Sequence, residues 1–175
     1  MSLSDVKVIP MKVLWNGTDL GSTSGGVEIS VSTESVDILL DQEGANPQDS
    51  FQVGTTVSVS MTILELNTTN YNSMIASSIG NTYTPTAGTA VYGFGTDRNF
   101  TSMLSRCQTL ELRPVNESDS TNSWSFWKSI PMPESLSFVP DSANSMSISF
   151  KIFPDATKTA EARIGVFGDN TQDFS

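Results

Sequence analysis

The chain contains no histidine and a single cysteine, Cys107. Without histidine, the sequence excludes a Ser-His-Asp or Cys-His nucleophile system and a zinc site with histidine ligands. One cysteine can form neither a disulfide within the chain nor a structural zinc site built from cysteines. We therefore expect no catalytic residues, no bound metal and no cofactor, and we expect that the protein is not an enzyme.

Long hydrophobic runs are lacking as well. No apolar stretch approaches the roughly 18 residues of a transmembrane helix, so we expect no membrane partner. The first residues, MSLSDVK, lack the apolar segment of a signal peptide, so we do not expect secretion. The glycine-rich stretch 21–26 is followed by neither Lys-Ser/Thr nor a helix pattern, which argues against a phosphate-binding loop.

Positive charge is scarce, and it is missing from a long segment of the chain. No lysine or arginine lies between Lys12 and Arg98, and the net charge of the 175 residues is −10. The same segment contains nine acidic residues: Asp19, Glu28, Glu34, Asp37, Asp41, Glu43, Asp49, Glu65 and Asp97. A surface of one charge sign repels polyanions, so we do not expect specific binding of nucleic acid.

Short strands and the turns between them account for most of the sequence. Its length of 175 residues fits one domain, 1–175, with flexible tails at about 1–5 and 168–175. Ser, Thr and Asn are abundant and favour strands and turns over helices. Alternating apolar residues predict strands at 6–15, 27–32, 36–41, 55–66, 103–113, 124–130, 146–152 and 164–167. With a short helix near 69–79, the sequence predicts a mainly β fold, a β-sandwich or barrel with one flanking short α-helix and long loops.

The most detailed local prediction is a β-hairpin within residues 27–41. Apolar residues occupy odd positions from Val27 to Ser32 and even positions from Val36 onward, and the three residues 33–35 between them fit a turn. One face of this hairpin would be apolar and the other mostly acidic. A slip of one residue would bury the carboxylates, so the pattern favours a single register.

Several stretches allow more than one interpretation. Three polar or glycine-rich stretches are predicted to be loops: 42–50, 80–98 and 114–123. The acidic stretch 41–49 could hold calcium, but it lacks the spacing and the terminal Glu of an EF-hand, so a solvated turn is the simpler interpretation. Trp124 and Phe126 could stack on a sugar, although a half-buried strand face is again simpler. Pro131 and Pro133 are expected to end that strand.

A series of short motifs follows a familiar order over residues 15–80. The run WNGTDLGSTSGGVEI at 15–29 is followed by DQEGANP at 41–47 and by a strand that closes in LEL at 64–66. This order resembles the major tail tube proteins of tailed bacteriophages, which often have a glycine-rich opening, an Asp-Gln-X-Gly turn and a long strand ending in Leu-X-Glu. The sequence departs from that pattern at Glu43, where an aromatic residue is commoner, and in its low basic content.

The resemblance implies a structural protein of the virion tail, made in the cytoplasm of a host bacterium. Members of the family fold as a small β-sandwich flanked by a helix and form hexameric rings that stack into a hollow tube. Hairpins from all six subunits join into an inner barrel, and the genome passes through its acidic channel without specific binding. The implied partners are further copies of the chain, a tail terminator, a tape measure protein, baseplate or tip proteins and, in a contractile tail, a sheath protein.

Two sets of candidate site residues follow from the resemblance and the strand pattern. The lumen-facing set is Glu28, Ser30, Ser32, Asp37, Asp41, Ser58, Ser60 and Thr62. The candidate contacts between subunits or rings are Gln42, Glu43, Asn46, Asp49, Thr84, Thr96, Asn116 and Asp119. Carboxylates and hydroxyls without lysine or arginine suit a channel that must not hold DNA through its phosphates.

Two other functions stay open on the sequence alone. Another virion or secretion-system component with the tube fold would also form rings, and growth into indefinite tubes would distinguish it. A secreted carbohydrate-binding β-sandwich would use Trp124, Trp127 and surface acids with calcium, and glycan binding would support it.

Overall fold

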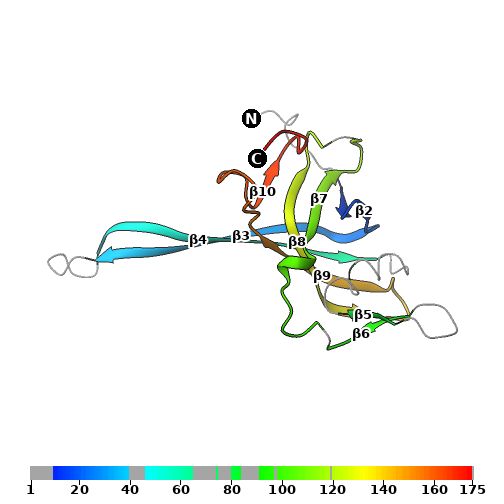
Figure 1. Cartoon of the computed structure of the whole chain (residues 1–175). Coiled ribbons are helices and arrows are strands. Elements are labelled where there is room, and N and C mark those ends of the chain that lie inside the picture. Colours follow the sequence, from blue (N-terminus) through cyan, green and yellow to red (C-terminus); the bar gives the residue numbers. More distant parts are fainter. Residues whose placement is uncertain are drawn as a thin grey trace.

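The computed structural model describes residues 10–39, 46–64, 74, 80–83, 91–96, 98–118 and 120–174, and these form mainly β structure (Figure 1). The elements are β1 (Met11–Trp15), β2 (Thr18–Asp19), β3 (Thr23–Leu39), β4 (Pro47–Ile63), β5 (Gly80–Tyr83), β6 (Val91–Phe94), the 3-10 helix η3 (Leu104–Arg106), β7 (Gln108–Pro114), β8 (Trp124–Ser137), β9 (Ser145–Phe153) and β10 (Gly165–Phe167). The predicted mainly β class is confirmed. The helix predicted at 69–79 lies outside the described residues except for Met74, whose side chain is buried in the core.

Eight of the strands form one antiparallel sheet. Their order is β2-β1-β7-β8-β9-β4-β3, and β10 pairs with the first residues of β8. β5 and β6 form a separate two-stranded ribbon. The large sheet is open, because β2 and β3 lie at its two ends and do not pair with each other.

The sheet curls around an apolar core. Trp15 of β1 and Phe150 of β9 are separated by two strands in the sheet, yet their ring centroids are 6.5 Å apart. The indole N–H of Trp15 donates to Ser129 Oγ (3.1 Å), and that hydroxyl donates to the carbonyl of Gln108 (2.7 Å), so these polar groups are satisfied inside the core. The buried cluster contains Val13, Trp15, Leu20, Val57, Val59, Met61, Ile63, Met74, Leu110, Leu112, Phe126, Met146, Ile148, Phe150 and Ile152. Burying one such side chain contributes roughly 1.5–3 kcal/mol.

The turn predicted at 33–35 is wrong, because β3 runs through these residues as one continuous strand. Glu34 lies opposite Gly54 and Ser35 lies opposite Gln52, so Val53 is an extra residue on β4. The break in the apolar alternation therefore marks a β-bulge and not a turn. The partner of β3 is β4, which begins at Pro47, so the loop predicted at 42–50 is too long at its C-terminal end.

Pro131 and Pro133 lie inside β8, so the strand end predicted there is also wrong. Both prolines pair with β9, and β7 pairs with β8 only as far as Ser129. Beyond Ser129, no described strand covers the second edge of β8. Two prolines at alternate positions fit this edge, because the missing N–H groups would both point away from β9.

Three further predictions have clear outcomes. The loop predicted at 80–98 contains the paired strands β5 and β6. Residues 104–106, predicted as part of a strand, form η3, and β7 begins only at Gln108. The strands predicted at 146–152 and 164–167 are confirmed as β9 and β10.

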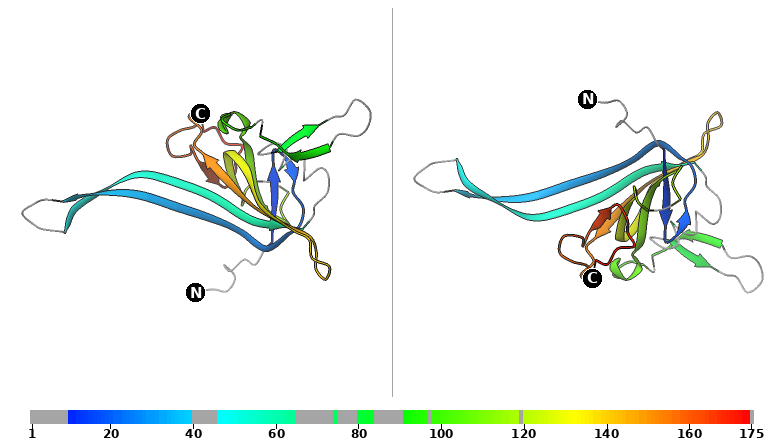
Figure 2. Two further views of the ribbon diagram at one scale, coloured as in Figure 1. Left: turned by 90° about the horizontal axis from the view of Figure 1, so that it is seen from below. Right: turned by 90° about the horizontal axis from the view of Figure 1, so that it is seen from above.

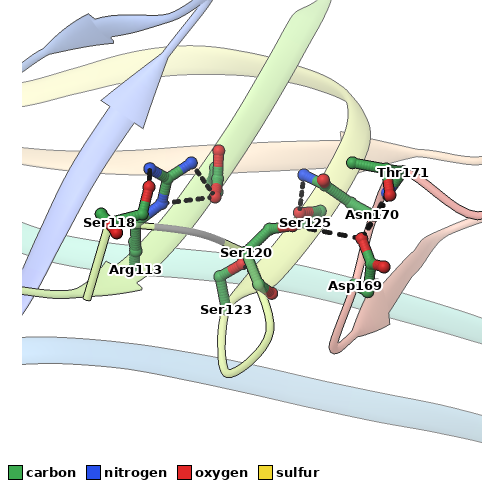
Figure 3. A network of polar contacts seen from close by, with 9 residues as sticks. Arg113, Ser118, Ser120, Ser123, Ser125, Asp169, Asn170 and Thr171 are labelled. Atoms are coloured by element: carbon green, nitrogen blue, oxygen red, sulfur yellow. Dashed lines mark hydrogen bonds and ion pairs between the residues drawn. The ribbon is translucent and has the colours of Figure 1, made fainter.

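Hydrogen bonds tie the segment after β10 to the body (Figure 3). The carboxylate of Asp169 accepts from the hydroxyl of Thr171 (2.6 Å) and from its backbone N–H (2.9 Å), while the amide of Asn170 donates to Ser125 Oγ (2.9 Å). The bonds from Thr171 lower the pKa of Asp169 to about 2, because they stabilise the charged carboxylate. The tail predicted to be flexible, 168–175, thus begins with residues that make several hydrogen bonds.

Candidate functional site: an assembly surface on the β3–β4 arm

A two-stranded arm extends from the body of the protein (Figures 1 and 2). β4 pairs with β9 only from Ser58 to Ile63. Among the described strands, residues 31–39 of β3 and 47–57 of β4 therefore pair only with each other, and we call these two stretches the arm. A two-stranded hairpin is only marginally stable in water, so the arm lacks the support that the rest of the sheet receives from its neighbours.

The arm exposes a group of large apolar side chains. The exposed fraction of each lies between 41% and 63%: Val31, Val36, Ile38, Leu39, Phe51 and Val53. Single exposed apolar residues are ordinary, but a group of six on one projection is typical of a surface that another molecule covers.

Apolar side chains lie on both faces of the arm. At its root, Ile29 is opposite Val59 on the face that continues into the core. Beyond the bulge, Val36 is opposite Phe51. Val36 and Ile29 are an odd number of residues apart on a continuous strand, so their side chains point to opposite faces. The bulge thus places the pair Val36–Phe51 on the face opposite to that of the pair Ile29–Val59.

Both long edges of the arm are open. Among the described strands, none pairs with the outer edge of β3, and none pairs with the second edge of β4 along 47–57. Unpaired N–H and C=O groups on an edge strand are a template for pairing with another chain. Gly25 and Gly26, with φ of 76° and 89°, are two extra residues at the start of β3 and bend it there.

The charges of the arm and its root are all negative. Glu28, Glu34, Asp37 and Asp49 are exposed, and no lysine or arginine occurs on β3 or β4. Asp37 accepts a hydrogen bond from Ser50 Oγ on the facing strand (2.7 Å). Glu28 makes no hydrogen bond or ion pair with any described residue, so its charge is available to a partner.

Most of the predicted lumen-facing residues share one face of the sheet, which we call the polar face. Register pairs and alternation place six of them there: Glu28, Ser30, Ser32, Ser58, Ser60 and Thr62. Asp37 lies an odd number of residues from Glu28 on the same strand, so alternation places it on the opposite face. Asp41 lies outside the described residues.

The predicted contact residues are spread over several parts of the chain. Asn46 and Asp49 are exposed at the far end of the arm, where β4 begins, and Thr96 and Asn116 are exposed in loops of the body. The other four lie outside the described residues: Gln42, Glu43, Thr84 and Asp119. Whether any of them contacts another subunit stays a prediction.

Sequence reasoning missed the part of the polar face that comes from β8 and β9. Lys151 lies directly opposite Ser58, so a lysine belongs to the face that the sequence predicted to be acidic. Glu134 and Ser147 line an open hollow of about 330 Å³ together with Glu28. The alternation of Ser147, Ser149 and Lys151 is visible in the sequence, but nothing local shows that β9 lies beside β4.

Comparisons with known proteins do not assign a family. No protein-family model and no curated protein matches the chain. Within the described ranges, no three Cys, Asp or Glu side chains are grouped so that they could hold a metal ion. No helix among the described residues is long and apolar enough to cross a membrane.

Proposed function

We propose that the protein is a structural subunit that assembles with further copies of itself through the β3–β4 arm. The observation that carries this proposal is the arm itself, which combines exposed apolar side chains with two open strand edges. A neighbour that pairs with these edges would satisfy their backbone groups and cover the apolar side chains.

The two open edges differ, so pairing of one with the other gives a head-to-tail contact. The β3 edge of one copy would pair with residues 47–57 of β4 in the next copy, and the strands would alternate in direction as they do in the sheet. A repeated head-to-tail contact closes into a ring when its rotation fits, and a closed ring has no free edges. The inner barrel that the resemblance implies would then be built by the arms of several copies.

The motifs at 15–80 suggest which assembly this is. We propose the tail tube of a tailed bacteriophage, in which hexameric rings stack into a channel for genome delivery. The part of the polar face before the bulge would line the channel, where its hydroxyls and Glu28 would let DNA pass without binding it. The partners would be the tail terminator, the tape measure protein, baseplate or tip proteins and, in a contractile tail, a sheath protein.

Electron microscopy tests this proposal directly. We expect the purified chain to form hollow rings or tubes of uniform width at high protein concentration, as seen by negative stain, with sedimentation velocity following the growth in mass. Single rings that never stack would favour another component with the tube fold. A chain that stays monomeric at every concentration, with the arm intact, would contradict assembly through the arm.

A second function is favoured by one observation on the body. Trp124 and Phe167 are exposed by 39% and 59%, and their ring centroids are 5.1 Å apart. Exposed aromatic rings of this kind can stack on sugars, as a carbohydrate-binding protein requires. Binding on a glycan array that is lost in Trp124→Ala would support this alternative, and absence of binding would remove it.

A further inference from the structure

The body of the protein carries a lysine at the point where the arm leaves the sheet. Lys151 is opposite Ser58, which is the first residue of β4 that pairs with β9. Its Nζ lies 5.5 Å from the ring centroid of Phe153, and it makes no ion pair with any described residue. The neighbouring Lys128 is already engaged, because its Nζ lies 3.1 Å from Asp155 Oδ1. Lys151 is therefore a solvent-exposed cation without an anionic partner in the described part of the chain.

The edge of β4 that continues past Lys151 is the open edge of the arm. A strand that pairs there and is antiparallel to β4 runs in the same direction as β9. It therefore begins beside the end of β9, next to Lys151, and runs outward to the tip of the arm. In the proposed assembly this strand is β3 of a second copy.

The positions of the carboxylates on β3 determine which of them would lie close to Lys151. The first carboxylate that β3 presents on the polar face is Glu28, which is exposed and has no partner among the described residues. Glu34, the next carboxylate on that face, lies about 20 Å further along an extended strand. The residues before Glu28 include the Gly25–Gly26 bulge, which bends the chain away from the line of the strand.

Resting on the proposed function, we propose that Lys151 of one copy forms an ion pair with Glu28 of the next copy. The pair places a cation of the body against the first acid of the incoming arm. It sets the register of the two copies, because a slip by one residue would move Glu28 to the other face of the sheet. It also gives Lys151 an anionic partner on the polar face.

A charge swap tests the pair in the full chain. We expect Lys151→Glu and Glu28→Lys each to raise the concentration needed for assembly by about fivefold, measured by sedimentation velocity. The double variant restores the pair with reversed charges, so its assembly concentration should return to within about twofold of the wild type. Thermal unfolding of each monomer checks that the body is intact.

Glu34→Lys is the matched control, since it makes the same charge change on the same strand and face. Combining it with Lys151→Glu should not restore assembly. Rescue by Glu34→Lys instead of Glu28→Lys would overturn the assignment of Glu28. Single variants that assemble like the wild type would overturn the ion pair alone, whereas a wild type that never assembles would overturn the proposed function with it.

Discussion

Phe51 offers a direct measure of how much the arm contributes to assembly. It lies opposite Val36, and 55% of its surface is exposed in the single chain. A phenylalanine side chain has roughly 200 Å² of surface, so about 110 Å² of it meets water. Covering this area would contribute about 2.8 kcal/mol per copy at about 25 cal/mol per Å². We therefore expect Phe51→Ser to weaken assembly by about 2–3 kcal/mol, which is roughly 30- to 150-fold in the required concentration.

The same substitution should leave the single chain almost unchanged. Phe51 is outside the core, so we expect the free energy of unfolding to change by no more than about 0.5 kcal/mol in urea denaturation. Phe100→Ser is the matched control, because Phe100 is fully exposed on the body and lies outside the arm. Sedimentation velocity over a range of concentrations compares the three proteins. The reasoning is refuted if Phe51→Ser assembles at the wild-type concentration, or if Phe100→Ser impairs assembly equally.

Three predictions concern the body. Gly165→Ala would place a Cβ 2.5 Å from the carbonyl oxygen of Ser125, so we expect β10 to detach and its amides to lose protection in hydrogen exchange. The folded-state pKa of Asp169, about 2, lies below the unfolded value of about 3.9. The wild type should therefore lose stability from this group as the pH falls from about 4 to about 2, whereas thermal melts of Asp169→Asn should lack this component. Trp15→Phe removes the N–H that donates to Ser129 Oγ, and we expect urea denaturation to show a loss of about 1–2 kcal/mol.

The sequence predicts the strands of the body well where their pattern is local. The alternation at 146–152 and at the end of β4 follows from one buried and one exposed face. β9 and the half of β4 that packs on the core can therefore be predicted without knowing which strands pair with them. The turn predicted at 33–35 fails for a physical reason. A bulge and a turn both interrupt the alternation, and only the pairing of Glu34 and Ser35 with β4 distinguishes them. That pairing cannot be inferred from residues 33–35 and their neighbours in the sequence alone.

The polar face shows the same division between local and non-local information. Glu28, Ser30 and Ser32 share a face because they alternate along one strand, and this much is visible in the sequence. Lys151 joins them only because the strand order places β9 beside β4. A count of charges along the chain therefore predicted an acid-only face, whereas the folded sheet adds a lysine to it.

The open edges of the arm differ from the unpaired edge of β8, and this difference favours pairing of the arm with another chain. Where the second edge of β8 is left without a partner in the described structure, Pro131 and Pro133 remove the N–H groups that another chain would need. Residues 31–39 and 47–57 of the arm contain one proline, Pro47, which lies at the start of β4. Its edges are also longer, and its apolar side chains are more exposed. If an open edge led only to unwanted pairing with other chains, we would expect prolines to block it, as they do in β8. The open edges of the arm therefore favour a partner strand with the same alternation, which a second copy of β3 would supply.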